Sequence, residues 1–251
     1  MRVGLIGAGN MASALARGWG EPVLCTDAVP GKAQALVDEL GGEVAESNAV
    51  LAAGVDALFL CHKPDQLDAV AAQVDGNEEG AAVVSILAGV TLDALRSAYP
   101  RAKAVVRLMP NVAVEIGRGV VCWAAESDRD DELRALLERV ATVVEVPERL
   151  IDVATAIQGV GPAYVSLFVE AQVDAAVRLG MPPRMAVELA TATTEGSAAL
   201  LEARDFDTLA LRRAVTSPGG VTARGLAALE DGGLRAAFQA AADAAVHGGG
   251  R

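Results

Sequence analysis

The sequence predicts an α/β fold in residues 1–150 and an all-helical domain in residues 151–251. In the first part, short apolar runs alternate with segments of helical periodicity, which is typical of βαβ units and a parallel sheet. The apolar runs are continuous, as in a doubly wound sheet covered on both faces. Beyond Asp152 no strand pattern is found. We therefore expect a doubly wound parallel sheet followed by a helical domain.

The elements follow in order along the chain. Strands are expected at 2–6, 22–26, 57–61, 82–87, 104–108, 119–124 and 142–146. Helices are expected between them at 11–19, 32–40, 65–74, 91–98 and 131–140. In the second part, residues 163–179 carry apolar side chains on one helical face and stop at Gly180. Further helices fit 182–203, 208–215, 221–229 and 234–246.

The composition limits the classes of partner and the cellular location that we expect. A formal net charge of −12 disfavours a nucleic-acid partner and a polybasic membrane contact, since both need clustered Lys and Arg. No uninterrupted apolar run reaches the roughly 18 residues of a membrane span. A strand starting at residue 2 leaves no room for a signal peptide, so we expect a cytoplasmic protein. An alanine-rich helical domain of this length needs a partner to cover its apolar faces, which predicts a homodimer.

The three cysteines, Cys25, Cys61 and Cys122, lie far apart and form no CxxC pair. This pattern speaks against a disulfide framework and against a zinc site. We expect reduced thiols and no metal.

A glycine-rich turn, Gly7-Ala8-Gly9-Asn10-Met11-Ala12, follows the first strand and opens the first helix. In this context the G-x-G-x-x-A pattern is a dinucleotide-binding fingerprint. Gly7 permits the tight turn and Gly9 lets the pyrophosphate approach the backbone, while Ala12 lets the helix pack on the strand. We therefore place Gly7, Gly9, Asn10 and Met11 in the cofactor site.

Asp27 ends the second strand, where a carboxylate can bind the ribose 2′-hydroxyl of NAD and repel the 2′-phosphate of NADP. By this argument alone NADH is preferred. Asn48 and the Lys63-Pro64 pair are candidates to line the same crevice, although polar residues at strand ends are as common without a function. His62 is interpreted as structural.

The segment Thr216-Ser217-Pro218-Gly219-Gly220-Val221-Thr222 is a second anion-binding signal. Helix-start N–H groups carry partial positive charge and have no intrahelical partner. Glycines leave them open to a ligand, so this turn can hold a small carboxylate.

With a glycine turn of this kind near each end, the chain resembles the pyrroline-5-carboxylate reductases over nearly its whole length. The markers are the first glycine turn, Lys63-Pro64, Ser85-Ile86-Leu87-Ala88-Gly89-Val90-Thr91, Arg107-Leu108-Met109-Pro110-Asn111, Gly161-Pro162-Ala163-Tyr164 with Glu170 and Asp174, and the Ser217 turn with Leu229 and Glu230.

This resemblance implies a Rossmann-type first domain and a helical dimerisation domain, in dimers that often build larger rings such as decamers. It implies reduction of the cyclic imine of pyrroline-5-carboxylate to L-proline by NAD(P)H, and many family members favour NADPH. The substrate carboxylate would fall to Ser217, Gly219, Gly220, Val221 and Thr222, with Thr222 close to the imine nitrogen. By the same resemblance Asn48 contacts the adenosine ribose, and Ala88, Met109 and Pro110 line the nicotinamide.

The sequence departs from the family pattern at several positions. The family usually reads Ser-Gly-Ser-Gly-Pro-Ala-Tyr, whereas Gln158-Gly159-Val160 here lacks both serines. Val221 stands where Ala or Thr is usual, and His62 replaces a small apolar residue. These changes keep alternatives open: a related imine reductase or β-hydroxyacid dehydrogenase, or a non-catalytic NAD(P)-binding regulator.

The chemistry expected from the residues is positioning rather than acid catalysis. The helical domain has no lysine, and its only histidine is His247. A dehydrogenase that oxidises an alcohol needs a proton acceptor, usually Lys or His. An iminium that arrives protonated needs neither, and Thr222 would hydrogen-bond its nitrogen. The alternative for Thr222 is a helix-start hydroxyl bonded to its own backbone.

Overall fold

The computed structural model describes residues 1–125 and 130–247. Contacts between residues divide the chain into two compact units, Met1–Val160 and Gly161–Arg251, and each is described by itself. The first unit continues past residue 150, because Ile151 is fully buried in the core of that unit.

The first unit is built on an eight-stranded sheet in the order β3-β2-β1-β4-β5-β6-β7-β8. Every neighbouring pair is parallel except β6 and β7, which are antiparallel. The strand order reverses at β1 and β4, so a crevice for a ligand is expected at the carboxyl ends of these two strands. The strands are β1 (Val3–Ile6), β2 (Val23–Thr26), β3 (Gly42–Val44), β4 (Ala57–Leu60), β5 (Ala82–Ser85), β6 (Ala104–Pro110), β7 (Gly119–Ala125) and β8 (Ala141–Glu145).

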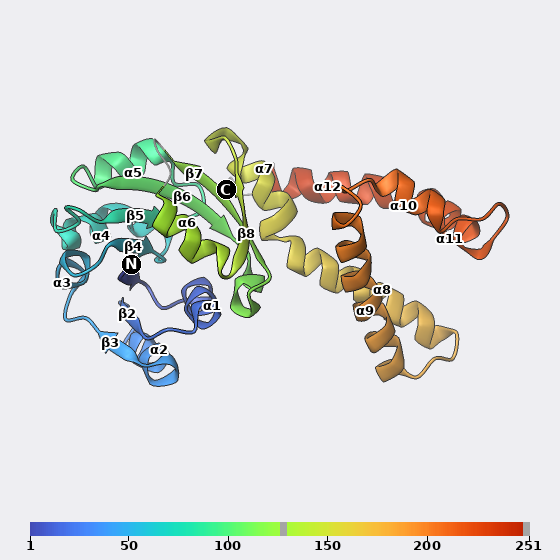
Figure 1. Cartoon of the computed structure of the whole chain (residues 1–251), viewed down its shortest axis with the longest axis horizontal. Helices are drawn as coiled ribbons and strands as arrows, with labels where there is room; N and C mark the ends of the chain where they lie inside the picture. The colour runs from blue at the N-terminus through green and yellow to red at the C-terminus, as the bar shows by residue number, and fades with distance from the viewer. Residues whose placement is uncertain (126–129, 248–251) are drawn as a thin grey trace. The chain divides into compact units, whose positions relative to one another are not determined.

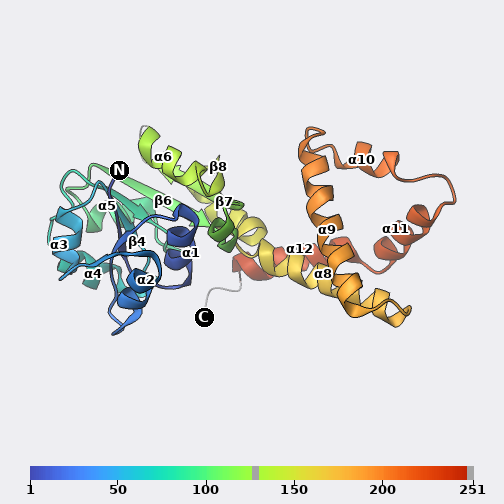
Figure 2. The same ribbon diagram turned by 60° about the horizontal axis from the view of Figure 1, so that its bottom comes forward.

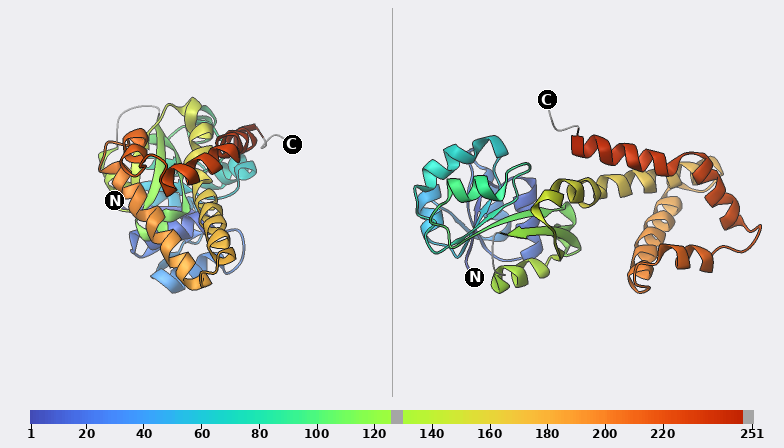
Figure 3. Two further views of the ribbon diagram at one scale, coloured as in Figure 1. Left: turned by 90° about the vertical axis from the view of Figure 1, so that its right-hand side faces the viewer. Right: turned by 90° about the horizontal axis from the view of Figure 1, so that it is seen from above.

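Helices cover both faces of this sheet (Figures 1 and 3). One core is formed by inward residues of the strands with α1 (Asn10–Trp19), α2 (Lys32–Leu40) and α6 (Asp131–Glu138). The other is formed with α3 (Asn48–Ala53), α4 (Leu67–Val74) and α5 (Leu92–Ala98). Alternate strand residues feed the two cores: Phe59 lies in the first, and Leu58 and Leu60 in the second. The predicted doubly wound sheet is confirmed.

Strand β3 and helix α3 of the first unit were not predicted from the sequence. Strand β3 is exposed along its length and therefore carries no apolar signal. It starts at Gly42, where a Cβ atom would lie 1.9 Å from the Val23 carbonyl oxygen, so only glycine lets the strand begin there.

Strand β7 is antiparallel because its connection to β6 is short. The 3-10 helix η2 (Val112–Ile116) and Gly117, at φ +69°, turn the chain back at once. A parallel pairing would need a crossover of a dozen residues or more.

The first unit ends in a helical segment that begins after β8. It contains the 3-10 helix η3 (Glu148–Leu150), α7 (Ile151–Ala154) and a π turn, η4 (Thr155–Gly159). Arg107 of β6 is 3% exposed and anchors this segment to the sheet by two ion pairs. Its guanidinium lies 3.4 Å from Glu148 and 3.1 Å from Asp152.

The second unit consists of α8 (Gly161–Arg178), α9 (Pro183–Glu202), α10 (Thr208–Ala214), α11 (Val221–Asp231) and α12 (Leu234–His247), coloured from yellow in α8 through orange to red in α12 in Figure 2. Its described residues include only two buried apolar side chains, Ala186 and Ala190. Large apolar side chains are exposed on its helices, among them Leu167, Phe168, Leu189, Leu229 and Phe238. The predicted helices are confirmed, and they bury little against one another.

One helical run of the described residues, Glu148–Arg178, is long and apolar enough to cross a membrane by length and composition alone. The sequence pattern did not indicate it, because η3, α7 and η4 join α8 into one run. Such a run is weak evidence for a span, since helices of soluble proteins pass the same test.

Candidate active site

The first glycine turn has the geometry of an open anion site. Gly7 has φ +104°, and a Cβ atom there would lie 2.8 Å from the Cys61 carbonyl. Gly9 caps α1 in an extended conformation without a side-chain hydrogen bond. A Cβ atom at Gly9 would meet nothing within 4 Å. The helix-start N–H groups of α1 therefore face open space, as a pyrophosphate requires.

Asp27, directly after β2, is engaged in the same turn. Its Oδ2 accepts the N–H of Ala8 at 2.7 Å, and its Oδ1 accepts the N–H of Val29 at 2.7 Å. An ionised carboxylate has about four acceptor positions, so both oxygens keep capacity for a ribose hydroxyl. The carboxylate thus also holds the turn in shape.

Asn48 lies at the start of α3, with its amide held at both ends. Its Oδ1 accepts the Thr26 hydroxyl at 2.6 Å, and its Nδ2 donates to Gln73 at 2.7 Å. Thr26 is the last residue of β2. These contacts fix Asn48 beside the Asp27 end of the sheet.

The Lys63-Pro64 turn follows β4. Lys63 is exposed, and its N–H donates to Gln66 at 3.2 Å. The Nδ1 atom of His62 lies 2.8 Å from the Lys63 carbonyl oxygen. A carbonyl oxygen only accepts hydrogen bonds, so Nδ1 carries the proton. Burial lowers the pKa of His62, against smaller opposing effects of the Lys63 carbonyl and Asp65. A neutral, half-buried imidazole fits the structural interpretation.

The loop after β5 and the carboxyl end of β6 hold the remaining cofactor candidates of this unit. Ala88 is exposed, while Met109 and Pro110 end β6 and are buried. Every candidate from Gly7 to Pro110 thus lies at or just after the carboxyl end of β1, β2, β4, β5 or β6, or starts a helix, as expected for ligands of an open α/β sheet.

Two polar residues near Met109 were not singled out from the sequence. Gln158 Nε2 donates to the Met109 carbonyl at 2.8 Å, and Asn111 Nδ2 donates to the Gln158 carbonyl at 3.1 Å. Asn111 was visible only as part of a family motif, and Gln158 only as a departure from one.

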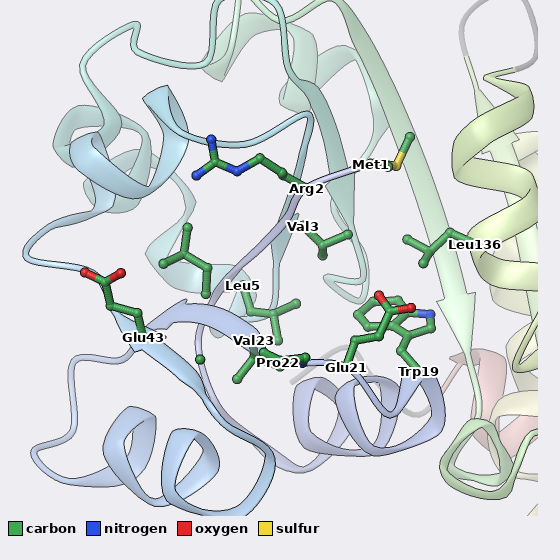
Figure 4. Close-up of a pocket in the computed structure, with 12 residues that line it drawn as sticks. Met1, Arg2, Val3, Leu5, Trp19, Glu21, Pro22, Val23, Glu43 and Leu136 are labelled. Carbon is green, nitrogen blue, oxygen red and sulfur yellow. The ribbon is translucent and has the colours of Figure 1, made fainter.

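A cavity of about 520 Å³ lies at the opposite edge of the sheet. It is bordered by the amino ends of β1, β2 and β3, with Trp19 and Leu136 from α1 and α6 (Figure 4). None of the candidate residues lines it, so its position does not match the crevice expected at the carboxyl ends.

In the second unit, the Ser217 turn precedes α11. Gly220 N–H donates to the Ser217 carbonyl at 3.0 Å, and Gly219 has φ +67°. Pro218 before a left-handed glycine is typical of a type II turn. A Cβ atom at Gly220 would lie 2.3 Å from Ser217 Oγ. Gly220 caps α11 without a side-chain hydrogen bond, and the first turn of α11 has no acidic residue.

Thr222 and Val221 are the first residues of α11, and Val221 is exposed. Thr222 makes no side-chain hydrogen bond to any of the described residues, so the alternative of a hydroxyl bonded to its own backbone is not observed. The turn is held instead by Arg224, which donates to the Gly219 carbonyl at 2.7 Å. The uncapped N–H groups of α11 and the Thr222 hydroxyl are therefore available to an anion.

Comparison with known proteins gives consistent matches. Residues 148–249 match the model for pyrroline-5-carboxylate reductase dimerisation, and residues 2–89 match that for NADP oxidoreductase, coenzyme F420-dependent. The pyrroline-5-carboxylate reductase of Synechocystis is 40% identical over 194 residues, covering 76% of this chain and 72% of its own. That of Corynebacterium melassecola is 32% identical, covering 96% and 95%.

Among solved structures, the pyrroline carboxylate reductase of Plasmodium falciparum with NADP bound superposes with a TM-score of 0.85 at 26% identity. The match covers 98% of this chain and 95% of that one.

Proposed function

The chain belongs to the pyrroline-5-carboxylate reductase family, and we propose that it reduces 1-pyrroline-5-carboxylate to L-proline with hydride from NADPH or NADH. The observation that carries this proposal is that each unit has a helix that starts directly after a glycine turn and has no side chain bonded to its first N–H groups. Helix α1 suits a pyrophosphate and α11 suits a carboxylate.

In this proposal the first unit binds the dinucleotide and the second binds the substrate and dimerises. The open backbone at Gly9, with Asn10 and Met11, takes the pyrophosphate. Asp27 and Asn48 face the adenosine ribose. Lys63, Pro64, Ala88, Met109 and Pro110 line the nicotinamide half of the crevice.

The Ser217 turn pins the substrate by its carboxylate. The N–H groups at Gly219 and Val221 and the hydroxyls of Ser217 and Thr222 are the proposed donors. Gly220 lines the site with its backbone, while its own N–H closes the turn onto the Ser217 carbonyl. The left-handed Gly219 and the close approach of Gly220 to Ser217 support this role, since both keep side chains away from the amides.

Thr222 is the proposed partner of the imine nitrogen. Its hydroxyl can accept from a protonated imine or donate to the amine product. The reduced nicotinamide supplies the hydride, and the substrate brings its own proton, so the chain contributes orientation. The absence of lysine from the second unit's sequence argues against a β-hydroxyacid dehydrogenase. The carboxylate-ready turn argues against a non-catalytic regulator.

A homodimer is the proposed assembly. The second unit exposes large apolar side chains on α8, α9, α11 and α12. A soluble monomer rarely exposes such a surface to water, so we expect a second copy of the chain to cover it. Assembly of dimers into a decamer and residence in the cytoplasm are further parts of the proposal. Light scattering on the purified chain would give the mass: a multiple of the 25.6 kDa protomer supports it, and a monomer contradicts it.

The activity is tested by adding pyrroline-5-carboxylate to enzyme and NADPH and following oxidation of the nucleotide. Proline formed in equal amount supports the proposal. Nucleotide binding without turnover would instead support the regulator.

A further inference from the structure

Gln158 lies in the π turn η4 at the end of the first unit. The Val160 N–H donates to the Thr155 carbonyl at 3.1 Å, five residues back. Single π turns interrupt the regular helical hydrogen bonds and occur frequently at functional sites. Here the turn places the Gln158 side chain against the carboxyl end of β6, where Met109 lies.

Two hydrogen bonds join Gln158 to that strand end. Its Nε2 donates to the Met109 carbonyl at 2.8 Å, and Asn111 Nδ2 donates to the Gln158 carbonyl at 3.1 Å. Asn111 is 8% exposed, and its Oδ1 also accepts the Val120 N–H of β7 at 3.2 Å. The residues on both sides of Pro110 are therefore held by Gln158.

The carboxyl end of β6 has a neighbouring strand on one side only. The pairing of β5 with β6 ends at Ser85 and Arg107, whereas β7 pairs with β6 as far as Pro110. In the described sheet, the last residues of β6 therefore lack the second strand ladder that holds the residues before them. The hydrogen bonds of Gln158 attach the main chain at this place.

This attachment is not explained by stability alone. The Oε1 atom of Gln158 is buried and has no hydrogen-bond partner within the described part of the chain. A buried acceptor without a partner costs free energy, and an apolar side chain of the same length would avoid that cost. What glutamine adds over such a side chain is a directed hydrogen bond to the Met109 carbonyl.

We infer that Gln158 is a positioning residue for hydride transfer, which acts through the main chain of Met109 and Pro110. These two residues are proposed to line the nicotinamide half of the crevice, so the inference rests on the proposed function. In this role Gln158 contacts neither the nucleotide nor the substrate.

The reaction is sensitive to the position of the nicotinamide. The reacting atoms must approach to about 3–3.5 Å, and a misplacement of about 1 Å can slow a reaction about a hundredfold. A looser end of β6 should therefore slow hydride transfer more than it weakens the binding of either NADPH or the imine.

The test measures hydride transfer in a single turnover, from the loss of NADPH fluorescence with enzyme in excess over NADPH and 1-pyrroline-5-carboxylate at saturation. Deuterium at the transferred position of NADPH should slow this phase, which identifies it as hydride transfer. The dissociation constant of NADPH, the KM of the imine and the melting temperature are measured alongside.

Two variants remove the hydrogen bond to Met109. Gln158→Met keeps the length of the side chain without an amide, and Gln158→Asn is one methylene too short to reach, so either variant carries the test if the other does not fold. Thr155→Val is the matched control. It removes the bond from the Thr155 hydroxyl to the Ile151 carbonyl at 2.7 Å, in the same helical segment, and leaves Met109 untouched.

Both Gln158 variants are expected to transfer hydride about tenfold more slowly than the wild type, with unchanged binding of NADPH and imine. The melting temperature of Gln158→Met should stay close to that of the wild type, because the donor and the unpartnered acceptor are removed together. Thr155→Val should transfer hydride at the wild-type rate.

Three results would overturn the inference. The first is a wild-type rate of hydride transfer in the Gln158 variants. The second is an equal loss in Thr155→Val, which would assign the effect to the integrity of the turn. The third is a loss confined to the binding of NADPH or of the imine.

Failure of this inference is distinguishable from failure of the proposed function. A wild type that forms proline, with Gln158 variants that are equally fast, would contradict the positioning role alone. A wild type that transfers no hydride to 1-pyrroline-5-carboxylate would contradict the proposed function, and the positioning role with it.

Discussion

The carboxylate of Asp27 accepts the Ala8 N–H at 2.7 Å, so the residue proposed to read the ribose also braces the glycine turn that holds the pyrophosphate. Its second oxygen accepts the Val29 N–H. Charge and turn geometry are therefore coupled at this site, and a substitution acts on both.

We expect Asp27→Ser to raise the preference for NADPH over NADH by about tenfold, because the charge that repels a 2′-phosphate is removed. The melting temperature should fall at the same time, since two backbone N–H groups lose their acceptor. The measurement is kcat/KM with each nucleotide, alongside thermal unfolding. An unchanged ratio would refute the ribose role and leave only the structural one.

Alanine substitutions at Gly9 and Gly7 should affect different properties, nucleotide binding in the first case and stability of the fold in the second. Gly9→Ala places a methyl group in open space, so stability should hold while NADPH binding weakens by an order of magnitude or more. Gly7→Ala meets the Cys61 backbone at 2.8 Å and also needs a left-handed φ, so it should destabilise the fold. Calorimetric binding and melting curves of both variants distinguish the two effects. Tight NADPH binding by Gly9→Ala would contradict the proposed pyrophosphate site.

Thr222→Ala should lower kcat/KM by roughly one to two orders of magnitude, the effect of losing a hydrogen bond to a partly charged group. The melting temperature should not change, because no other described residue uses this hydroxyl. Thr222→Ser is the matched control and should retain most of the activity. Equal kinetics in Thr222→Ala and the wild type would remove Thr222 from the site.

His62 should make stability depend on pH. Its pKa is lowered in the folded chain, chiefly by burial, from an ordinary value of 6.5. As the pH falls through the window just below 6.5, the unfolded chain takes up the proton first, so stability decreases. Above that window both states are neutral and no dependence arises.

The corresponding measurement is the melting temperature from about pH 8 to about pH 5.5. His62→Ala should show a smaller decrease than the wild type over this range. If both lose stability equally, other groups account for the acid sensitivity.

Substitution of the two acidic partners of Arg107 should lower the free energy of unfolding by unequal amounts. Glu148 also accepts the Leu92 N–H at 2.6 Å, and its side chain is 32% exposed, against 65% for Asp152. Glu148→Gln should therefore cost about 1–3 kcal/mol of unfolding free energy. Asp152→Asn should cost under about 1 kcal/mol, since a solvated pair is screened. Chemical denaturation of both variants checks the order, and the reverse order would be incompatible with this geometry.

The sequence predicted the elements whose burial leaves a pattern. The strand Ala57–Leu60 is apolar throughout because it lies between two helical layers, and the glycine turn is readable because each position has its own steric requirement. Strand β3 was missed because its residues are exposed, and the direction of β7 because it depends on the length of a connection.

The side-chain partners of the candidate site were less predictable. Thr26 and Asn48 are far apart in the sequence and meet only because β2 ends where α3 begins. The contact of Gln158 with Met109 depends on a π turn, which has no simple sequence signature. Such contacts follow from tertiary structure, so a pattern along the chain does not reveal them.

The most direct test of the account is the stoichiometry of a single assay containing the purified chain, NADPH and pyrroline-5-carboxylate. We predict one L-proline formed for each NADPH oxidised, with both rates lost when pyrroline-5-carboxylate is omitted. NADPH that binds but is not oxidised, or is oxidised without forming proline, would contradict the assignment.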